Sequence, residues 1–282
     1  IVKTSEDFGS QGEWPSHPEL LDWLAVEFIE SGWDIQHMQR LMLTSAAYAQ
    51  VALVSSEKQA EDPENRLLPR GVSHRLDAEA IRDGALYLSG LLVEEVGGPS
   101  VKPYQPSGIW FAVGYSGSNT VRFAQDVGEK LYRRSLYTFW KRTAPPPSLS
   151  TFDAPSREEV CVRRERTNTP LQALVLLNDV PYVEAARVWA ERLLSTDTSD
   201  SERLGTAFRM ATSREPAAVE IEILVELLNA QRMAFAADAT AAAALIAVGE
   251  SMTDTTLQPA ELAAWTAVTS VILNLHETIT RG

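Results

Sequence analysis

Basic and aromatic side chains are interleaved most densely between residues 129 and 179 of the sequence. An arginine or lysine beside an aromatic ring can bind an anionic, ring-bearing ligand, such as a sulfated or carboxylated sugar, through charge and stacking. This chemistry defines the candidate ligand-binding residues, which are Tyr104, Arg133, Arg134, Trp140, Lys141, Arg163 and Arg166. The first of them precedes the dense segment, in a loop that also carries aromatic residues.

The charge distribution gives the same arginines a second role. The formal net charge of −13 is distributed as −10 over residues 1–100, +5 over 101–166 and −8 over 167–282. A basic centre between two acidic flanks favours arginines that bind carboxylates of the neighbouring helices and hold an irregular segment in place. We therefore favour the structural role and keep ligand binding as the alternative. In that case a ligand site would consist of those arginines of the basic segment that bind no carboxylate.

Glu79 and Asp83, two acidic residues of one predicted helix, allow two interpretations of how their charge is neutralised. They are four residues apart, so their side chains are neighbours and repel each other unless a cation lies between them. In one interpretation Arg75 and Arg82 neutralise a solvated face, which is the usual behaviour of surface pairs. In the other, this acidic face receives arginines from the central basic segment.

His74 and Asp153 are the candidates for acid or base chemistry. A proton-shuttling histidine needs a carboxylate partner, and the sequence places none beside His74. None of the four histidines lies at a metal-site spacing from another ligand, and the sequence contains no nucleophile elbow, phosphate-binding loop or dinucleotide fingerprint. The sequence therefore predicts no metal site and leaves open whether the protein is an enzyme.

Composition restricts the partners and the redox chemistry. The single cysteine, Cys161, excludes an intrachain disulfide and a cysteine-rich haem-attachment motif. Its arginine neighbours could lower the pKa of the thiol, although a small buried residue is the more common state of a free cysteine. The negative net charge disfavours nucleic acid as a partner. No apolar run reaches the length of a membrane span.

Periodicity predicts mainly α-helical elements around these residues. Ser16 and Asp34 are predicted to cap two amphipathic helices that form an antiparallel hairpin. The polar stretch over residues 55–65 is expected to be a solvated loop. A third helix is predicted from about residue 77 to 92, and Ala-rich helices follow from residue 199 to the end of the sequence.

The middle of the chain is predicted to be irregular. Residues 97–128 are rich in Gly, Ser, Pro and Asn, and residues 133–142 alternate in a way that favours a short strand. Thr169 and Pro170 open a short helix that is apolar on nearly every side, so we expect it to be buried. The predicted fold class is mainly α, with helical hairpins or a bundle and a loop-rich, partly extended central insertion.

The predicted domain organisation has two parts. A core domain covers residues 1–195 and contains the basic segment 129–179. An Ala-rich helical subdomain covers residues 196–282 and packs on the core.

Several long blocks of the sequence, in order, resemble a known family. They include TSEDFGSQGEWPSHPELLDWLAVEFIESGWDIQHMQRLMLTSAAYAQ, RLDAEAIRDGAL, GGPSVKPYQPSGIW and LYRRSLYTFWKRTAPPPSLSTFDAPSREEVCVRRERTNTPLQALVLLND. This pattern is similar to the C-terminal domain of unknown function in large exported proteins of planctomycetes. In that family the domain commonly follows a cytochrome-c-like domain that carries a C-x-x-C-H haem motif.

The resemblance implies a secreted, periplasmic or cell-surface protein associated with haem electron transfer and with the breakdown of sulfated polysaccharide. It transfers no catalytic residues, and a c-type haem would lie in an upstream domain, because this chain has no C-x-x-C-H motif. The chain begins IVKTSEDFG, inside the family domain, so the missing signal peptide is no sign of a cytoplasmic protein. We also expect exposed apolar surface near residues 1–30.

These observations lead to two hypotheses of function. The first is an uncharacterised accessory or interaction domain of an exported cytochrome-associated protein, with the other domains of that protein as partners. The alternative is an enzyme or binding domain that acts on an anionic polysaccharide, and an oxidative version of it would use a haem partner domain. No nucleic acid and no membrane span are expected in either case.

Overall fold

The structure is a computed structural model that describes residues 1–7, 9–115 and 117–281. Helices dominate it, and the sheet found in these ranges has two strands of two residues each, so the predicted mainly α fold is confirmed. The chain divides into two compact units. The smaller unit contains Ile1–Arg75, Val160–Arg163 and the residues from Thr280 on, and the larger contains Leu76–Glu159 and Arg164–Ile279.

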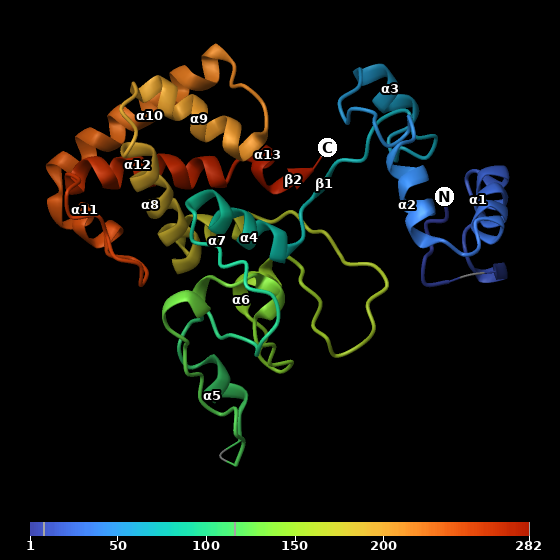
Figure 1. Cartoon of the computed structure of the whole chain (residues 1–282), viewed down its shortest axis with the longest axis horizontal. Helices are drawn as coiled ribbons and strands as arrows, with labels where there is room; N and C mark the ends of the chain where they lie inside the picture. The colour runs from blue at the N-terminus through green and yellow to red at the C-terminus, as the bar shows by residue number, and fades with distance from the viewer. Residues whose placement is uncertain (8, 116, 282) are drawn as a thin grey trace. The chain divides into compact units, whose positions relative to one another are not determined.

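The smaller unit is built on a helical hairpin. Helices α1 (Pro18–Glu30) and α2 (Ile35–Leu43) pack on each other (Figure 1), as the sequence predicts. Asp34 caps α2 by accepting hydrogen bonds from two backbone amides of its first turn. Ser16 was predicted to cap α1, but His17 is the N-cap residue and the Ser16 hydroxyl bonds to the carbonyl of Ile1 instead.

The described part of the smaller unit also contains η1 (Gly9–Gln11), α3 (Ser56–Glu61) and two strands, β1 (His74–Arg75) and β2 (Thr280–Arg281), which pair in antiparallel fashion. The prediction of a loop over residues 55–65 was wrong for α3, because the hydroxyl of Ser55 caps this one-and-a-half-turn helix by accepting from the amide of Lys58. Neither α1 nor α2 has a buried residue, and Trp23 is 49% exposed. The expected apolar surface near residues 1–30 is therefore present.

Two helices form the centre of the larger unit, α8 (Val180–Leu194) and α12 (Pro259–Leu273). They pack against each other through Trp189 and Trp265, which are fully buried, and through small residues that let the backbones approach. The hydroxyl of Thr269 in α12 donates to the carbonyl of Ala186 in α8 at 2.8 Å. Helix α4 (Ala78–Ser89) packs on α8.

The remaining C-terminal helices surround α12 (Figure 1). They are α9 (Asp200–Thr212), α10 (Ala218–Ala237), α11 (Ala239–Ile246) and α13 (His276–Ile279). Because residues on both sides of position 195 share one core, the predicted boundary at that position falls inside the larger unit. No helix in the described ranges is long and apolar enough to span a membrane.

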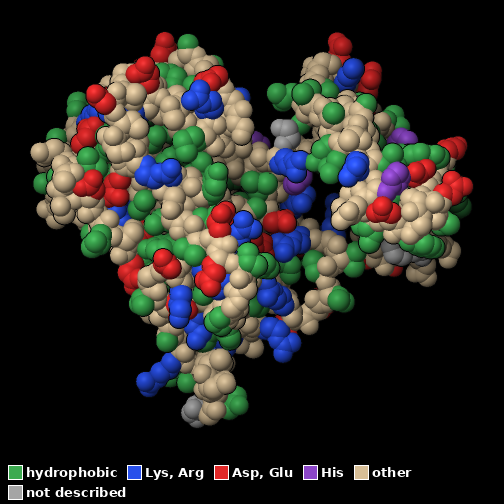
Figure 2. Space-filling model, viewed as in Figure 1, with side chains coloured by type: hydrophobic (Ala, Val, Ile, Leu, Met, Phe, Trp, Pro, Cys, Tyr) green, Lys and Arg blue, Asp and Glu red, His purple; other side chains and the backbone are tan. Residues whose placement is uncertain are grey.

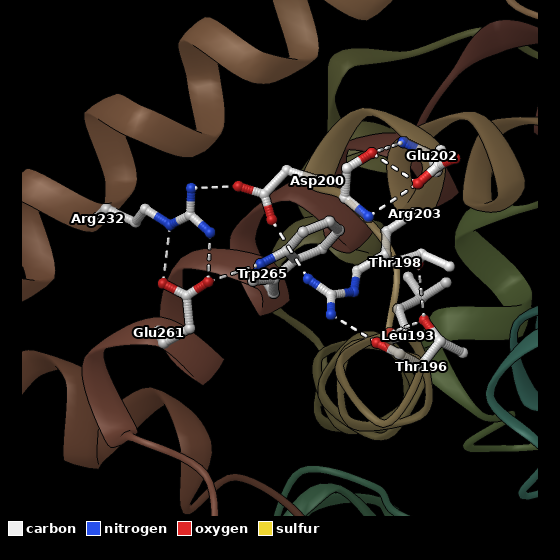
Figure 3. A network of polar contacts seen from close by, with 10 residues as sticks. Leu193, Thr196, Thr198, Asp200, Glu202, Arg203, Arg232, Glu261 and Trp265 are labelled. Atoms are coloured by element: carbon white, nitrogen blue, oxygen red, sulfur yellow. Dashed lines mark hydrogen bonds and ion pairs between the residues drawn. The ribbon is translucent and has the colours of Figure 1, made fainter.

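A polar network ties three of these helices together (Figure 3). The guanidinium of Arg232 in α10 binds Glu261 of α12 through two nitrogens, at 2.8 and 2.5 Å, and Asp200 of α9 at 2.7 Å. Arg203 of α9 also contacts Asp200, and the indole nitrogen of Trp265 donates to Glu261 at 2.9 Å. Arg232 lowers the pKa of the Asp200 carboxyl, although partial burial opposes it.

The central insertion connects α4 to α8 with little regular structure. It contains the short elements α5 (Ile109–Val113), η2 (Gly128–Tyr132), η3 (Ser135–Tyr137) and α6 (Pro147–Thr151), and α7 (Pro170–Asn178) follows. The strand predicted over residues 133–142 was wrong. That segment forms the 3-10 turn η3 and two isolated parallel bridges, Val93 with Arg133 and Val101 with Thr138, so it has no continuous ladder.

Helix α7 begins as predicted, with Thr169 as the cap, Pro170 in the first turn and Gln172 completing a capping box. Its predicted burial was wrong. Gln172 and Leu176 are buried, whereas Leu171, Leu174 and Leu177 on the other faces are exposed. An apolar helix of nine residues thus packs through one face only.

Candidate functional site

Buried arginines hold the insertion together. The guanidinium of Arg133 donates to the carbonyls of Pro99 at 3.2 Å, Glu95 at 3.0 Å and Gly97 at 2.5 Å, and it stacks on the ring of Tyr137 at 4.0 Å. Its side chain is 5% exposed. Each of these carbonyls belongs to a segment without regular structure, so the arginine supplies the hydrogen bonds that a helix or sheet would provide. Arg133 is therefore part of the scaffold.

Arg82 has the same role from helix α4. It donates to the carbonyls of Arg133 at 3.0 Å and Leu131 at 2.6 Å, and to the hydroxyl of Ser135 at 3.1 Å. Asp83, the next residue, accepts from the amide and the hydroxyl of Ser135. Burial lowers the pKa of Arg82, and Asp83 partly offsets this effect. Consecutive residues of α4 thus bind the same turn of the insertion.

The acidic start of α4 receives arginines from the basic segment, which is the second of the two interpretations of its charge. Arg164 binds Glu79 through both terminal nitrogens, at 2.6 and 3.2 Å, and lies 3.7 Å from Asp77. Arg166 lies 3.8 Å from Asp77. Burial acts to raise the pKa of Glu79, but the bonds from Arg164 outweigh it and lower that pKa below its usual value.

Tyr104 belongs to a buried carboxylate cluster. Its hydroxyl accepts from the amide of Glu250 at 2.8 Å. Glu184 of α8 is completely buried and accepts from the hydroxyl of Tyr132 and from the amides of Glu250 and Ser251, all within 2.8 Å. Burial and the neighbouring Glu184 raise the pKa of Tyr132 to about 12. The cluster ties the loop after α11 to the insertion.

Gly249 lies against the side chain of Glu184 in this cluster. A Cβ atom at this position would lie 2.2 Å from the Cδ of Glu184, and the φ of +94° is unfavourable for any other residue. Only glycine therefore lets the loop approach the carboxylate.

Other predicted residues are also engaged in local contacts. The indole nitrogen of Trp140 donates to the carbonyl of Ser156 at 2.9 Å, and Arg157 stacks on the ring at 4.7 Å. Arg134 is half exposed and lies 3.7 Å from Glu94. Neither residue is among those that line the cavity of about 360 Å³ described below.

The two candidates for acid or base chemistry lie in different units. His74 is in β1 of the smaller unit, where its backbone pairs with Arg281. Asp153 is in the larger unit and accepts from the amide of Thr167 at 2.7 Å and from its hydroxyl at 3.0 Å. Asp153 thus ties together two parts of the insertion, and a catalytic role for either residue stays a prediction.

Arg163 lines a cavity of about 500 Å³ in the smaller unit. The charged residues around it bind each other, since Lys3 pairs with Glu64 at 3.1 Å and Arg66 with Glu13 at 3.3 Å. Cys161, close to Arg163 in sequence, is exposed, so its predicted burial was wrong. No group of histidine, cysteine, aspartate or glutamate in the described ranges could hold a metal ion.

Lys141 contacts Trp110, which lines a second cavity, in the larger unit. Its ammonium group donates to the carbonyl of Thr120 at 2.7 Å and lies 5.0 Å from the centre of the Trp110 ring. Trp110 is buried and contacts Phe123 edge-on at 5.1 Å and Phe139 at 5.4 Å. Lys102 lies over the rings of Trp110 and Phe139. Two lysines and three aromatic rings of the insertion thus form one cluster.

The cavity beside this cluster has a volume of about 360 Å³. Its wall combines aromatic rings, amide side chains and one guanidinium, and consists of Gln105, Ser107, Gly108, Trp110, Phe111, Val121, Arg122, Phe123 and Gln125. Phe111 is 70% exposed. The side-chain nitrogens of Gln105 and Trp110 have no hydrogen-bond partner among the described residues. We call these residues the insertion cavity.

Among the described residues, the wall of the insertion cavity contains no carboxylate, histidine or cysteine, and therefore no acid–base pair of side chains. Arg122 in the wall and the ammonium groups of Lys102 and Lys141 near the Trp110 ring place positive charge at this cavity, and Asp126, which accepts from the amide of Lys102, adds a negative charge nearby. Figure 2 shows basic side chains, with acidic ones among them, on the face of the larger unit around α6. None of the predicted ligand residues is among those that line this cavity, and Lys141 contacts the wall residue Trp110.

The residues of the insertion cavity were not predicted from the sequence. Trp110, Phe111 and Phe123 stand in a Gly-rich loop, where aromatic residues indicate either local packing or a binding surface. The signal that could have selected them is the isolated Arg122 between aromatic residues, outside the dense basic segment.

The fold and this site define a mainly helical domain with an irregular, arginine-stabilised insertion. The model of a family described as PSD1, a protein of unknown function (DUF1553), matches residues 1–228, and the chain belongs to this family. The match extends from the start of the smaller unit into helix α10. No curated protein and no solved structure matches the chain.

Proposed function

We propose that this chain is a non-catalytic accessory domain that binds an acidic saccharide in the insertion cavity. The observation that carries the proposal is the composition of that cavity, in which exposed and buried aromatic rings, two glutamine amides and Arg122 occur without any acid–base residue. A volume of about 360 Å³ lies within the usual range for small-molecule sites.

Each part of the wall matches a part of such a ligand. The exposed ring of Phe111 offers a face to the C–H side of a sugar, and the Arg122 guanidinium suits the paired oxygens of a sulfate or carboxylate. The unpartnered side-chain nitrogens of Gln105 and Trp110 are donors in the same wall. An unsatisfied buried donor costs about 1–3 kcal/mol, which an acceptor brought by a ligand would recover.

The contacts of the arginines, Tyr104 and Asp153 argue against the enzymatic alternative. Arg133 and Arg82 bind backbone carbonyls, Tyr104 accepts from a backbone amide, and Asp153 holds Thr167. Those groups are therefore occupied by the scaffold. The c-type haem of the oxidative version would have to come from another domain, because this chain has one cysteine and no C-x-x-C-H motif.

The proposal also covers the cellular location of the domain and its partner domains. The resemblance to exported planctomycete proteins supports a secreted, periplasmic or cell-surface location and an association with a cytochrome-c-like domain. The exposed apolar side chains of the α1–α2 hairpin, among them Leu20, Trp23, Val26 and Ile29, support contact with other domains of the same protein. Amide hydrogen exchange of α1, slower in a longer protein than in the isolated chain, would test that contact.

Saccharide binding can be tested by titration calorimetry with sulfated and uronic-acid oligosaccharides and their neutral counterparts. We expect the acidic ligands to bind with a Kd on the order of 0.01–1 mM, which corresponds to about 4–7 kcal/mol. Phe111→Ala and Arg122→Gln should each weaken binding by about tenfold, the effect of one lost charge-assisted or stacking contact.

Arg134→Gln is the matched control, because it removes the same charge from a half-exposed arginine that is absent from the cavity wall. It should leave the affinity unchanged. Absence of binding across the panel, or an equal loss in Arg134→Gln and Arg122→Gln, would contradict the proposal.

A further inference from the structure

A second cavity of the larger unit has a different chemistry. It has a volume of about 170 Å³ and lies among α4, α7, α8, α9, α12 and α13. No charged side chain lines it. Tyr87 of α4 and Met210 of α9, which are 67% and 41% exposed, contribute to its wall. We call it the α4 cavity.

Gly84 creates part of this space. It lies in the middle of α4 and lines the cavity, and a Cβ atom at its position would meet nothing within 4 Å. Glycine inside a helix is about 1 kcal/mol less favourable than alanine. The helix therefore carries a destabilising residue at the point where a side chain would enter the cavity.

Tyr182 supplies an unused donor in the same wall. Its side chain is 1% exposed and its hydroxyl has no hydrogen-bond partner among the described residues. Burial raises its pKa, so the hydroxyl keeps its proton at neutral pH. The wall has two further hydroxyls: that of Thr278 donates to the carbonyl of Ile272 at 2.8 Å, and that of Tyr87 belongs to a side chain that is 67% exposed. Among the described residues, the wall thus offers apolar surface and one buried donor without a partner, the Tyr182 hydroxyl.

We propose that the α4 cavity binds a small uncharged molecule with an aromatic or alicyclic ring and one carbonyl oxygen, which accepts a hydrogen bond from Tyr182. The size argues for a single ring, because a dry apolar cavity of about 150 Å³ accommodates benzene. The absence of charged residues from the wall excludes an ionic ligand, whose desolvation nothing there would offset. This ligand is distinct from the acidic saccharide of the insertion cavity.

The test uses two ring compounds of nearly equal size, acetophenone with a carbonyl oxygen and ethylbenzene without one. Titration of the whole chain, followed by calorimetry or by NMR of the Met210 methyl group, should give a Kd for acetophenone on the order of 0.1–1 mM. Ethylbenzene should bind about tenfold more weakly, which is the effect of one hydrogen bond. Tyr182→Phe should remove this preference and retain ethylbenzene binding.

Substitutions at Gly84 test the location. Gly84→Leu should fill the cavity and abolish binding of both compounds, and Gly84→Ala, a smaller change that favours the helix, should weaken it severalfold. Gly205→Ala is the matched control, because Gly205 also lies inside a helix, α9, but is absent from the cavity wall. It should leave both affinities unchanged, as should Arg122→Gln.

Three results would overturn the proposal. They are failure of both compounds to bind the unmodified chain, unchanged binding in both Gly84 variants, and an acetophenone preference that survives in Tyr182→Phe.

Discussion

Two buried arginines that hold the insertion and two arginines of the C-terminal helical region have different main partners. Arg82 of α4 and Arg133 of the insertion donate to backbone carbonyls of the insertion. Arg232 of α10 binds the carboxylates of Asp200 and Glu261, and Arg214, between α9 and α10, binds those of Glu220 and Glu277 (Figure 3 shows the Arg232 network). The difference follows from the backbone. Helical carbonyls already accept bonds from their own helix, whereas carbonyls of an irregular segment need another donor.

This comparison explains how a segment with little regular structure keeps a defined shape. The guanidinium fork presents several donors in a fixed plane, so one arginine can satisfy carbonyls from separate stretches of chain. Arg133 does so for residues 95–99, and Arg82 for residues 131–133. In the helical part the same side chain connects elements that are already formed. Loss of a buried arginine that binds carbonyls of the insertion should therefore be more costly than loss of an arginine that binds carboxylates of formed helices.

Arg82→Met should have the largest effect. The substitution keeps the apolar stem but leaves the carbonyls of Leu131 and Arg133 buried without a donor, and we expect a loss of about 3–5 kcal/mol in the free energy of unfolding. Urea unfolding followed by circular dichroism measures it. Arg142→Met, at an exposed arginine 4.0 Å from Glu158, is the control and should change stability by no more than about 0.5 kcal/mol. Equal losses in the two variants would contradict the structural role of Arg82.

Arg232→Met should have an intermediate effect. It removes three charge-assisted bonds, but their partners Asp200 and Glu261 are about one-third exposed and can be hydrated. We expect a loss of about 1–2 kcal/mol in the same unfolding experiment. The comparison variant is Arg209→Met, where a single exposed pair with Glu215 is lost and a change below about 0.5 kcal/mol is expected. A loss as large as that of Arg82→Met would remove the difference between the two regions.

Glu79→Gln should have the smallest effect, and it depends on pH. Because Arg164 lowers the pKa of Glu79 in the folded chain below the usual value of 4.5, the ion pair stabilises the fold above pH 4.5 and loses that effect as the pH falls through the folded-state pKa. The variant should be less stable than the unmodified chain by less than about 1 kcal/mol at pH 7. Urea unfolding at several pH values should show this difference shrinking below pH 4.5. A difference that is constant with pH would show that charge is not its cause.

The helices could be predicted from the sequence to a large extent. Local signals set them, such as Asp34 before α2, Thr169 and Pro170 before α7, and the apolar periodicity of α9 and α12. The environment of an apolar helix could not be predicted in this way. The leucines of α7 are buried or exposed according to which neighbours reach them, and that depends on the tertiary arrangement.

In the insertion, the charge pattern of the sequence predicted only part of the contacts that the arginines make. The excess of basic residues indicated a structural role for the arginines, and the Arg164–Glu79 pair agrees with the predicted binding to an acidic helix. The main partners of Arg133 are carbonyls, which every residue possesses, so no pattern of side chains could identify them. For the same reason the sequence did not distinguish Arg133, which is buried, from Arg134, which is half exposed.

These two neighbouring arginines permit the most direct test of the central claim, that guanidinium forks on backbone carbonyls hold the insertion in shape. The measurement is amide hydrogen exchange of residues 94–101 in Arg133→Lys and in Arg134→Lys. Lysine keeps the charge but cannot bind three carbonyls in one plane. The account predicts exchange faster by about tenfold or more in Arg133→Lys, corresponding to a loss of at least about 1.4 kcal/mol, and no change in Arg134→Lys. Equal exchange in the two variants would contradict it.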